Sequence, residues 1–190
     1  MLSLDDTLWS NLNPKTFAPR YPALLRELTE TIAAGKYSLD SLGDLCTMCW
    51  DWSTFDSTFA SVPHLVHICR KQPPEATARI DLLAWVGWCV ACIHLNRQDG
   101  PVQLKQWYND SVPVARDLIA ESLPFTHASA GEQRNVRELL AAFAACHGNP
   151  ALAFILYELE AGGFKCDHCK SFILPMKSSM NPMWEPNEGS

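Results

Sequence analysis

Hydrophobic residues recur every three or four positions along most of this chain, a spacing that predicts amphipathic helices. Proline, glycine and short polar breaks separate the apolar stretches. The expected helices span approximately residues 5–12, 22–34, 38–49, 55–71, 75–96, 104–123, 129–147 and 150–161. Residues 50–54 are expected to form a loop, and only Phe164 with residues 172–174 fits a small β-hairpin. The sequence therefore predicts an all-α fold.

One tripeptide occurs twice within this pattern. Ser61-Val62-Pro63 returns as Ser111-Val112-Pro113, 50 residues further on, and Tyr21-Pro22 begins a looser copy 41 residues before Pro63. Each copy precedes two apolar stripes separated by a short polar break. Repeats of roughly 40–50 residues with two helices each are typical of α-solenoids. An internal proline is expected to kink the first helix of a pair or to delay its start.

The repeats predict one helical domain over residues 1–162, followed by a knuckle-like loop and tail over residues 163–190. The domain is expected to be a short right-handed stack of about three antiparallel helix pairs. Residues 75–96 are apolar on several faces, which predicts a central helix. The expected core residues are Leu28, Leu45, Phe59, Val66, Leu83, Trp88, Leu118, Leu139, Phe143 and Leu156.

Antiparallel helix pairs with proline in the first helix resemble HEAT repeats over approximately residues 20–160. The chain is also similar to a loose group of small bacterial HEAT-like proteins. These share a Trp…Ala-x-Val-Pro-His-Leu-Val stretch and a C-terminal Phe-x-Cys-x-x-Cys, which correspond here to residues 59–66 and 164–169. Some members of the group look like partners of toxins, so the resemblance implies an immunity-type inhibitor.

Composition and charge narrow the classes of function. The chain is 47% hydrophobic and 19% charged, which indicates a globular protein. Its net charge of −6 argues against nucleic-acid binding, which needs a basic face. No apolar run reaches the roughly 18 residues of a membrane span, and the first residues lack the basic region of a signal peptide. We therefore expect a cytoplasmic protein.

Eight cysteines include three Cys-x-x-Cys pairs. Cys46/Cys49 and Cys89/Cys92 fall within expected helices, where this spacing places both thiols on one face and favours core packing. Cys166/Cys169 instead falls in a polar loop and is half of a zinc-knuckle pattern. A closed zinc site needs two more ligands, and Cys146 with His147 are the nearest candidates. A metal-free loop is the alternative.

The sequence contains little that points to catalysis. His64 and His67 lie one helical turn apart, but no further ligand follows at the spacing of a zinc protease. No phosphate-binding glycine loop or nucleophile elbow is present. These patterns favour a non-enzymatic protein-binding module. The alternatives are a small metal-dependent hydrolase that uses Cys166, Cys169 and histidines, and a thiol-based redox sensor.

An acidic and aromatic segment is the best sequence candidate for a binding surface. Between Tyr37 and Cys69 there are four aspartates and no lysine or arginine. Exposed tryptophans commonly anchor interfaces, and unpaired acids suit a basic partner such as a toxin. The alternative is that both indoles pack in the core. The candidate partner-binding residues are Asp44, Trp50, Asp51, Trp52, Phe55 and Asp56.

The substitution Trp52→Ala tests this segment. If Trp52 anchors the partner, binding weakens by about 2 kcal/mol or more, while circular dichroism shows an unchanged fold. Loss of folding would place Trp52 in the core, and unchanged affinity in a folded variant would remove it from the interface.

Overall fold

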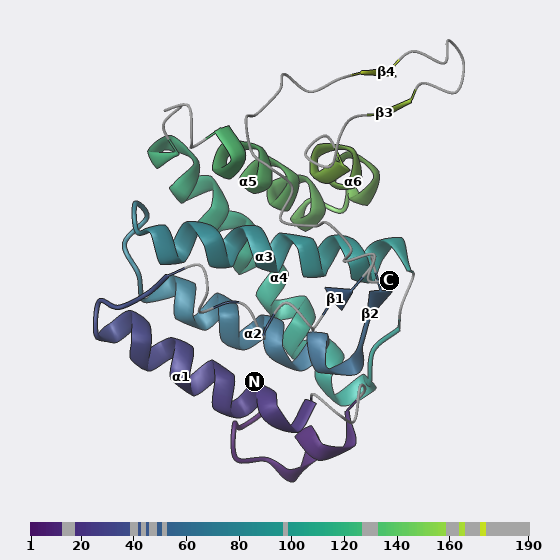
Figure 1. Ribbon diagram of the computed structural model, residues 1–190. Helices are drawn as coiled ribbons and strands as arrows, with labels where there is room; N and C mark the ends of the chain where they lie inside the picture. Colours follow the sequence, from purple (N-terminus) through teal and green to yellow (C-terminus); the bar gives the residue numbers. More distant parts are fainter. Residues whose placement is uncertain are drawn as a thin grey trace, which may run out of the picture. The chain divides into compact units, whose positions relative to one another are not determined.

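The computed structural model describes residues 1–12, 18–38, 42, 45, 49–50, 53–96, 99–126, 133–158, 164–165 and 172–173. It is all-α, as the sequence predicts, with short paired strands at two places (Figure 1). Its α-helices are α1 (Tyr21–Ala33), α2 (Asp56–Arg70), α3 (Thr77–Leu95), α4 (Val102–Ser122), α5 (Gln133–Cys146) and α6 (Pro150–Glu158). Single 3-10 turns cover Thr7–Asn11, Ala18–Arg20 and Leu123–Phe125.

The helix ends follow local sequence signals. The carboxylate of Asp6 accepts a hydrogen bond from the Leu8 N–H at 2.8 Å and so caps the first 3-10 turn. Pro22 stands in the first turn of α1, where its missing N–H leaves no bond unmade. Gly35 and Gly148 follow α1 and α5 with φ of 67° and 74°, a backbone conformation that favours glycine.

The internal prolines do not delay the helices that contain them. Helix α2 begins at Asp56, ahead of Pro63, and α4 begins at Val102, ahead of Pro113. The expectation of a late start is therefore wrong. At the beginning of α2 the Thr58 hydroxyl accepts a hydrogen bond from the Phe55 N–H at 3.3 Å. This capping bond offsets part of the cost of the internal proline.

The segment before α2 corrects two expectations. Strand β1 (Cys49–Trp50) pairs antiparallel with β2 (Ser53–Thr54), with Cys49 opposite Thr54. Cys49 therefore does not lie on a helical stripe, and residues 50–54 are not wholly loop. Tryptophan and threonine are among the residues that favour strands, and here that preference overrides the helical spacing. Leu42 and Leu45, expected on the same stripe, are both buried.

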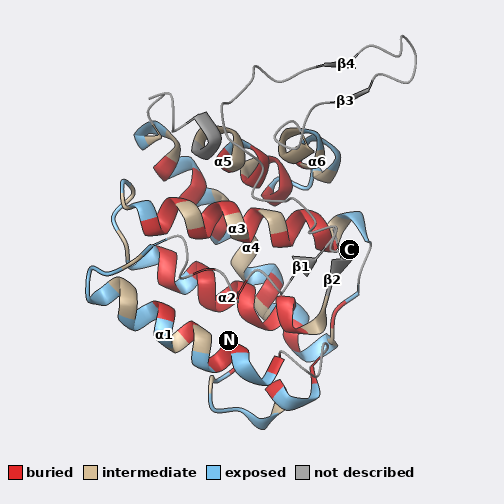
Figure 2. Cartoon of the chain, viewed as in Figure 1, coloured by how far each residue is buried: buried red, intermediate tan, exposed pale blue. Residues whose placement is uncertain are grey.

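Helix α3 is the centre of the described fold. It packs against α2, α4 and α5, and its contact with α5 is the most extensive between any two helices. Figure 1 shows α1, α2 and α3 side by side, with α4 behind α2 and α3. In Figure 2, α2 and α3 are buried over most of their length, whereas α1 alternates between buried and exposed residues. The central position predicted from residues 75–96 is confirmed.

The apolar character of α3 also resembles that of a membrane span. Among the described residues, it is the one helix with the length and composition to cross a bilayer, which corrects the expectation that no segment reaches that length. However, 72% of its apolar window is buried inside the protein. Its neighbours supply the apolar surroundings, as in the core helix of a soluble protein.

Most of the predicted core is confirmed. Seven of the expected residues are buried, namely Leu28, Leu45, Phe59, Val66, Leu83, Leu118 and Leu139. Trp88, Phe143 and Leu156 are only partly buried, and of these Trp88 and Phe143 pack against the core from its edge. The Trp88 ring contacts Tyr157 edge-to-face with centroids 4.9 Å apart, at a side of α3 covered by the nine-residue α6. A helix that short leaves large side chains at the edge of the core.

The contact between α3 and α5 depends on small residues. A Cβ added at Gly87 would lie 2.1 Å from the Cβ and 2.2 Å from the Cα of Ala142. Ala141 and Ala145, on the same helix as Ala142, are also fully buried. Backbones this close leave no room for a side chain at residue 87, so the glycine is required by packing.

The chain divides into two compact units, Met1–Tyr157 and Glu158–Ser190. The first contains all the helices except the last residue of α6. In the second, strand β3 (Phe164–Lys165) pairs antiparallel with β4 (Phe172–Ile173), with Phe164 opposite Ile173. This is the small hairpin predicted from the sequence.

The substitution Gly87→Ala tests the packing of α3 on α5. Inside an exposed helix this change stabilises by about 1 kcal/mol, because alanine is the better helix former. Here we expect the opposite sign, a loss of about 2–3 kcal/mol or more, since the new methyl group overlaps Ala142. Urea unfolding monitored by circular dichroism measures the difference.

Gly35→Ala is the matched control, because no atom lies within 4 Å of the added Cβ and only backbone strain remains. Its expected cost is about 1 kcal/mol. A stabilised Gly87→Ala variant would contradict the described contact between α3 and α5.

Candidate functional site

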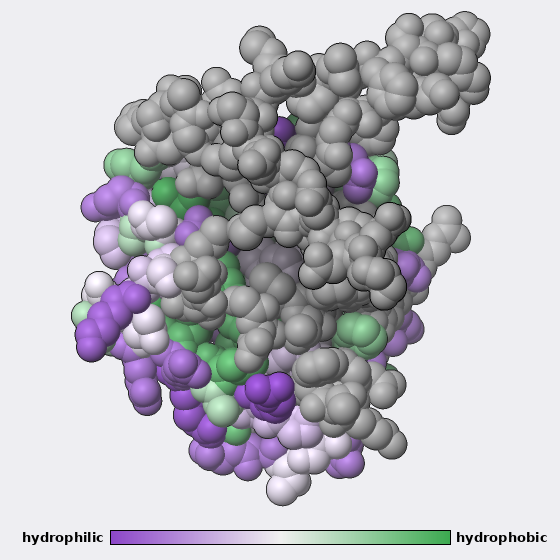
Figure 3. Space-filling model, viewed as in Figure 1, coloured by the Kyte–Doolittle hydropathy of each residue, from purple (hydrophilic) through white to green (hydrophobic). Residues whose placement is uncertain are grey.

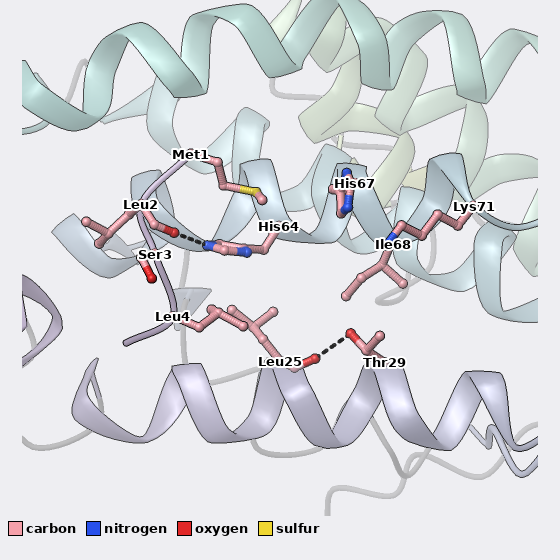
Figure 4. A pocket seen from close by; sticks show the side chains of 10 residues that line it. All are labelled: Met1, Leu2, Ser3, Leu4, Leu25, Thr29, His64, His67, Ile68 and Lys71. Carbon is pink, nitrogen blue, oxygen red and sulfur yellow. Dashed lines mark hydrogen bonds between the residues drawn. The ribbon is translucent and has the colours of Figure 1, made fainter. Parts of the chain in front are cut away.

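Two hollows border helix α2 and are the candidate functional site. The first, here called the α1–α2 hollow, has a volume of about 310 Å³ and lies between α1 and α2 (Figure 4). Figure 3 shows hydrophobic side chains gathered along this boundary, with hydrophilic residues on the outer side of α1. The hollow is lined by Met1, Leu2, Ser3, Leu4, Leu25, Thr29, His64, His67, Ile68 and Lys71.

The first residues of the described chain close one end of the α1–α2 hollow. His64 Nε2 donates to the Leu2 carbonyl at 2.8 Å, and the Trp9 indole donates to the Ser3 carbonyl at 2.9 Å. An ion pair between Asp5 and Arg26 of α1 adds a third attachment. Two buried aromatic side chains therefore hold this segment through its backbone, and the buried side chain of Leu2 adds an apolar anchor.

The second hollow lies on the other side of α2, between α2 and α4, and is here called the α2–α4 hollow. It has a volume of about 300 Å³. Pro63 and Ser111, one from each copy of the duplicated tripeptide, both line it. The remaining lining residues are Met1, Val66, His67, Arg70, Trp107, Asp110 and Val114. His67 and Met1 line both hollows, so the two are neighbours across one ridge.

Basic side chains gather on this ridge, and Arg70 and Lys71 carry its positive charge at neutral pH. His67 and Arg70 are exposed in the last turn of α2, and Lys71 caps the helix. None of these three side chains forms an ion pair with a residue that the structure describes. Burial, and then the nearby charges of Lys71 and Arg70, lower the pKa of His67 below its ordinary value. A bound anion would compensate this charge density.

His64 is the most strongly perturbed histidine. It is 6% exposed and lies beside Trp9, with ring centroids 6.0 Å apart. Burial lowers its pKa to about 4, although its hydrogen bond to the Leu2 carbonyl opposes the shift. Because a carbonyl only accepts hydrogen bonds, Nε2 carries the proton of the neutral ring. His64 is therefore a structural group that holds the wall of the hollow.

The described residues offer no catalytic arrangement. Within them, no group of three or more histidine, cysteine or acidic side chains is placed to hold a metal ion. The Ser61 hydroxyl is buried and makes no hydrogen bond there, so it is not an accessible nucleophile. Burial raises the pKa of Cys69 and of Cys146 to about 12. Both thiols stay protonated at neutral pH, which makes them poor nucleophiles and poor redox centres.

The sequence candidates for partner binding are described only in part. Phe55 and Asp56 are half-buried at the start of α2, and the backbone of Trp50 lies in β1. Asp44, Asp51 and Trp52 lie outside the described residues. The assignment of this segment to an interface stays a prediction.

The sequence candidates for zinc are similarly divided. Cys166 and Cys169 lie outside the described residues. Cys146 is buried at the end of α5, while His147 is exposed and its ring lies 4.3 Å from that of Phe143. Zinc ligation requires a thiolate, and the burial that raises the pKa of Cys146 opposes its formation.

Sequence reasoning missed both the hollows and an ion pair made by a buried arginine. Arg79 of α3 is 3% exposed and donates to Glu121 at 2.6 Å, and also to the carbonyls of Gln72 and Leu118. This guanidinium joins the end of α2, α3 and α4. The available signal was an arginine among the apolar residues of the central helix. For the hollows the signal was a group of basic residues, His67, Arg70 and Lys71, shortly after the first copy of the tripeptide.

Comparisons with known proteins give no relative. No protein-family model, curated protein or solved structure matches this chain. The resemblance to HEAT-like proteins therefore remains a prediction from the sequence.

The perturbed pKa of His64 predicts a pH dependence of stability. Its pKa is lowered from 6.5 to about 4 in the fold, so the unfolded chain binds the extra proton first. The stability that His64 contributes is complete above pH 6.5. It is lost as the pH falls towards 4, and the total loss is up to about 3 kcal/mol. Urea unfolding at a series of pH values measures this loss.

The control is His64→Gln, because a neutral amide can donate to the Leu2 carbonyl but does not titrate. The difference between the two proteins isolates His64 from the other titrating groups. Parallel stability curves from pH 7 to 4 would show that His64 is not buried as described.

Proposed function

We propose that α2–α5 form two repeats of a short α-solenoid of the HEAT-like kind. Support comes from the contacts, because α2 packs on α4 and α3 packs on α5, while consecutive helices also touch. A two-layer stack of helix pairs has this pattern. Further support is that buried positions of α2 and α4 recur at the same offset of 50 residues, namely Leu65 and Ala115, Ile68 and Leu118, and Cys69 and Ile119.

The function we propose is that of a non-enzymatic protein-binding module. The observation that supports it best is the pair of adjoining hollows on either side of α2, which share His67. They combine apolar side chains with charged groups, as protein interfaces do. Trp107 and Arg70, both in the α2–α4 hollow, belong to the residue types that dominate binding energy.

The class of partner follows from the sequence resemblance. Similarity to small bacterial HEAT-like proteins favours an immunity-type inhibitor that covers a toxin. The acidic segment around residues 44–56 suits a basic surface on that toxin. No observation of the described residues favours the hydrolase or the redox sensor over this proposal.

Site-specific photocrosslinking tests the binding function. A benzophenone amino acid replaces Val114, which lines the α2–α4 hollow and is 36% exposed. The control replaces Val102, the first residue of the same helix, which is 89% exposed and lines neither hollow. Both variants are expressed in the source cells, irradiated and analysed by mass spectrometry.

We expect Val114 to crosslink one protein in a saturable manner, with a stoichiometry near one to one, while Val102 does not. A hollow that encloses no partner gives the same scattered products at both positions. That result, or a crosslink made only from Val102, would contradict a binding function for this surface.

A further inference from the structure

We propose that the α1–α2 hollow recognises an acidic segment of the partner protein, with a carboxylate next to an apolar side chain. This inference rests on the proposed binding function and adds the chemistry of the ligand. The hollow combines a cationic edge with an apolar floor, and the described residues that line it include no acid.

The cationic edge is supplied by Lys71, and beside it the ring of His67, whose lowered pKa keeps it neutral at neutral pH, offers a hydrogen-bonding group. Both line the hollow and both are exposed. Neither pairs with an acid among the residues that the structure describes. In a chain with net charge −6, unpaired positive charge beside an acid-free hollow is complementary to an anion and opposite to the rest of the protein.

The apolar floor indicates that the anionic group of the ligand is accompanied by an apolar group. Leu4, Leu25 and Ile68 line the hollow, and Figure 4 shows that they come from the first residues, α1 and α2. A hollow of about 310 Å³ is at the small end of ligand-sized sites, so it accommodates one or two side chains and not a folded surface. An inorganic anion would leave this apolar lining uncovered.

The position of positive side chains at the end of α2 does not by itself indicate a binding site. Positive side chains are generally favoured in the last turn of a helix, where they interact with the helix dipole. The helix dipole explains neither the apolar floor of the hollow nor the absence of acidic residues from its described lining. The α2–α4 hollow provides a comparison within the same molecule, because Asp110 lines it together with Arg70 and reduces the excess of positive charge.

The experiment begins with random hexapeptides displayed on phage and selected against the full chain. We expect the enriched peptides to contain aspartate or glutamate next to leucine, isoleucine, methionine or phenylalanine. The affinity of one enriched peptide is then measured by calorimetry for the wild type and for two charge reversals, Lys71→Glu and Lys36→Glu.

Lys36 is the matched control, since it is exposed after α1 and lines neither hollow. Both reversals change the net charge equally. We expect Lys71→Glu to weaken the peptide at least about tenfold and Lys36→Glu to leave it within about twofold. Equal losses would mean that the peptide responds only to overall charge, and would overturn the proposal.

A steric pair of variants gives a second test that does not depend on charge. Thr29 lines the hollow, so Thr29→Trp fills it, whereas Ala23→Trp places the same side chain on exposed α1 surface outside it. We expect binding to be lost only in the first. Retained binding in a folded Thr29→Trp variant would overturn the proposal.

The outcomes separate this inference from the proposed function. Enrichment of basic peptides, or of peptides without any acidic residue, overturns the acidic ligand even where Val114 crosslinks a protein. If Val114 crosslinks nothing and no peptide is enriched, the binding function and this inference fail together.

Discussion

The fold depends on the burial of α3. This helix is apolar on nearly every side, so it is stable in water only when other elements cover it. Helices α2, α4 and α5 provide that cover. On one side the backbones approach so closely that only glycine fits at residue 87. On another, Arg79 brings a charge into the core, where its two terminal nitrogens donate to Glu121 and two backbone carbonyls. A buried arginine without those acceptors would cost several kcal/mol, so Arg79 links α3 to α4 and to the residue that follows the cap of α2.

The candidate site is a consequence of this arrangement. Because α3 covers one side of α2, the flanks of α2 face α1 and α4, and neither neighbour fills the adjoining space completely. The first residues of the chain close part of one gap, and His64 and Trp9 hold them there through backbone carbonyls. The exposed end of α2 then brings His67, Arg70 and Lys71 between the two hollows. Rigid backbone around a charged and partly apolar hollow is an arrangement suited to recognition.

The sequence was sufficient for the six α-helices that the structure describes, and for the central place of residues 75–96, because amphipathic spacing and apolar content are local signals. It was insufficient for Cys49, where pairing of Trp50 with Ser53 replaces the expected helix. It also overestimated the burial of Trp88, Phe143 and Leu156, which are only partly buried, since the extent of coverage is a property of packing and not of local spacing. Each hollow depends on how segments that are distant in the sequence meet in the fold. The sequence indicated only the charged residues that line the hollows. The solenoid and the interface at residues 44–56 remain proposals.

The central claim is that the hollows beside α2 are open in the free protein and covered in the complex. Hydroxyl-radical footprinting, with and without the crosslinked partner, measures this directly at single residues. The account predicts that labelling of Met1, Trp107 and His67, which line the hollows, falls severalfold in the complex. Labelling of Phe125, which is 45% exposed after α4 and lines neither hollow, is predicted to stay the same. Unchanged labelling of Trp107 and His67 in a complex that protects Phe125 would contradict the account.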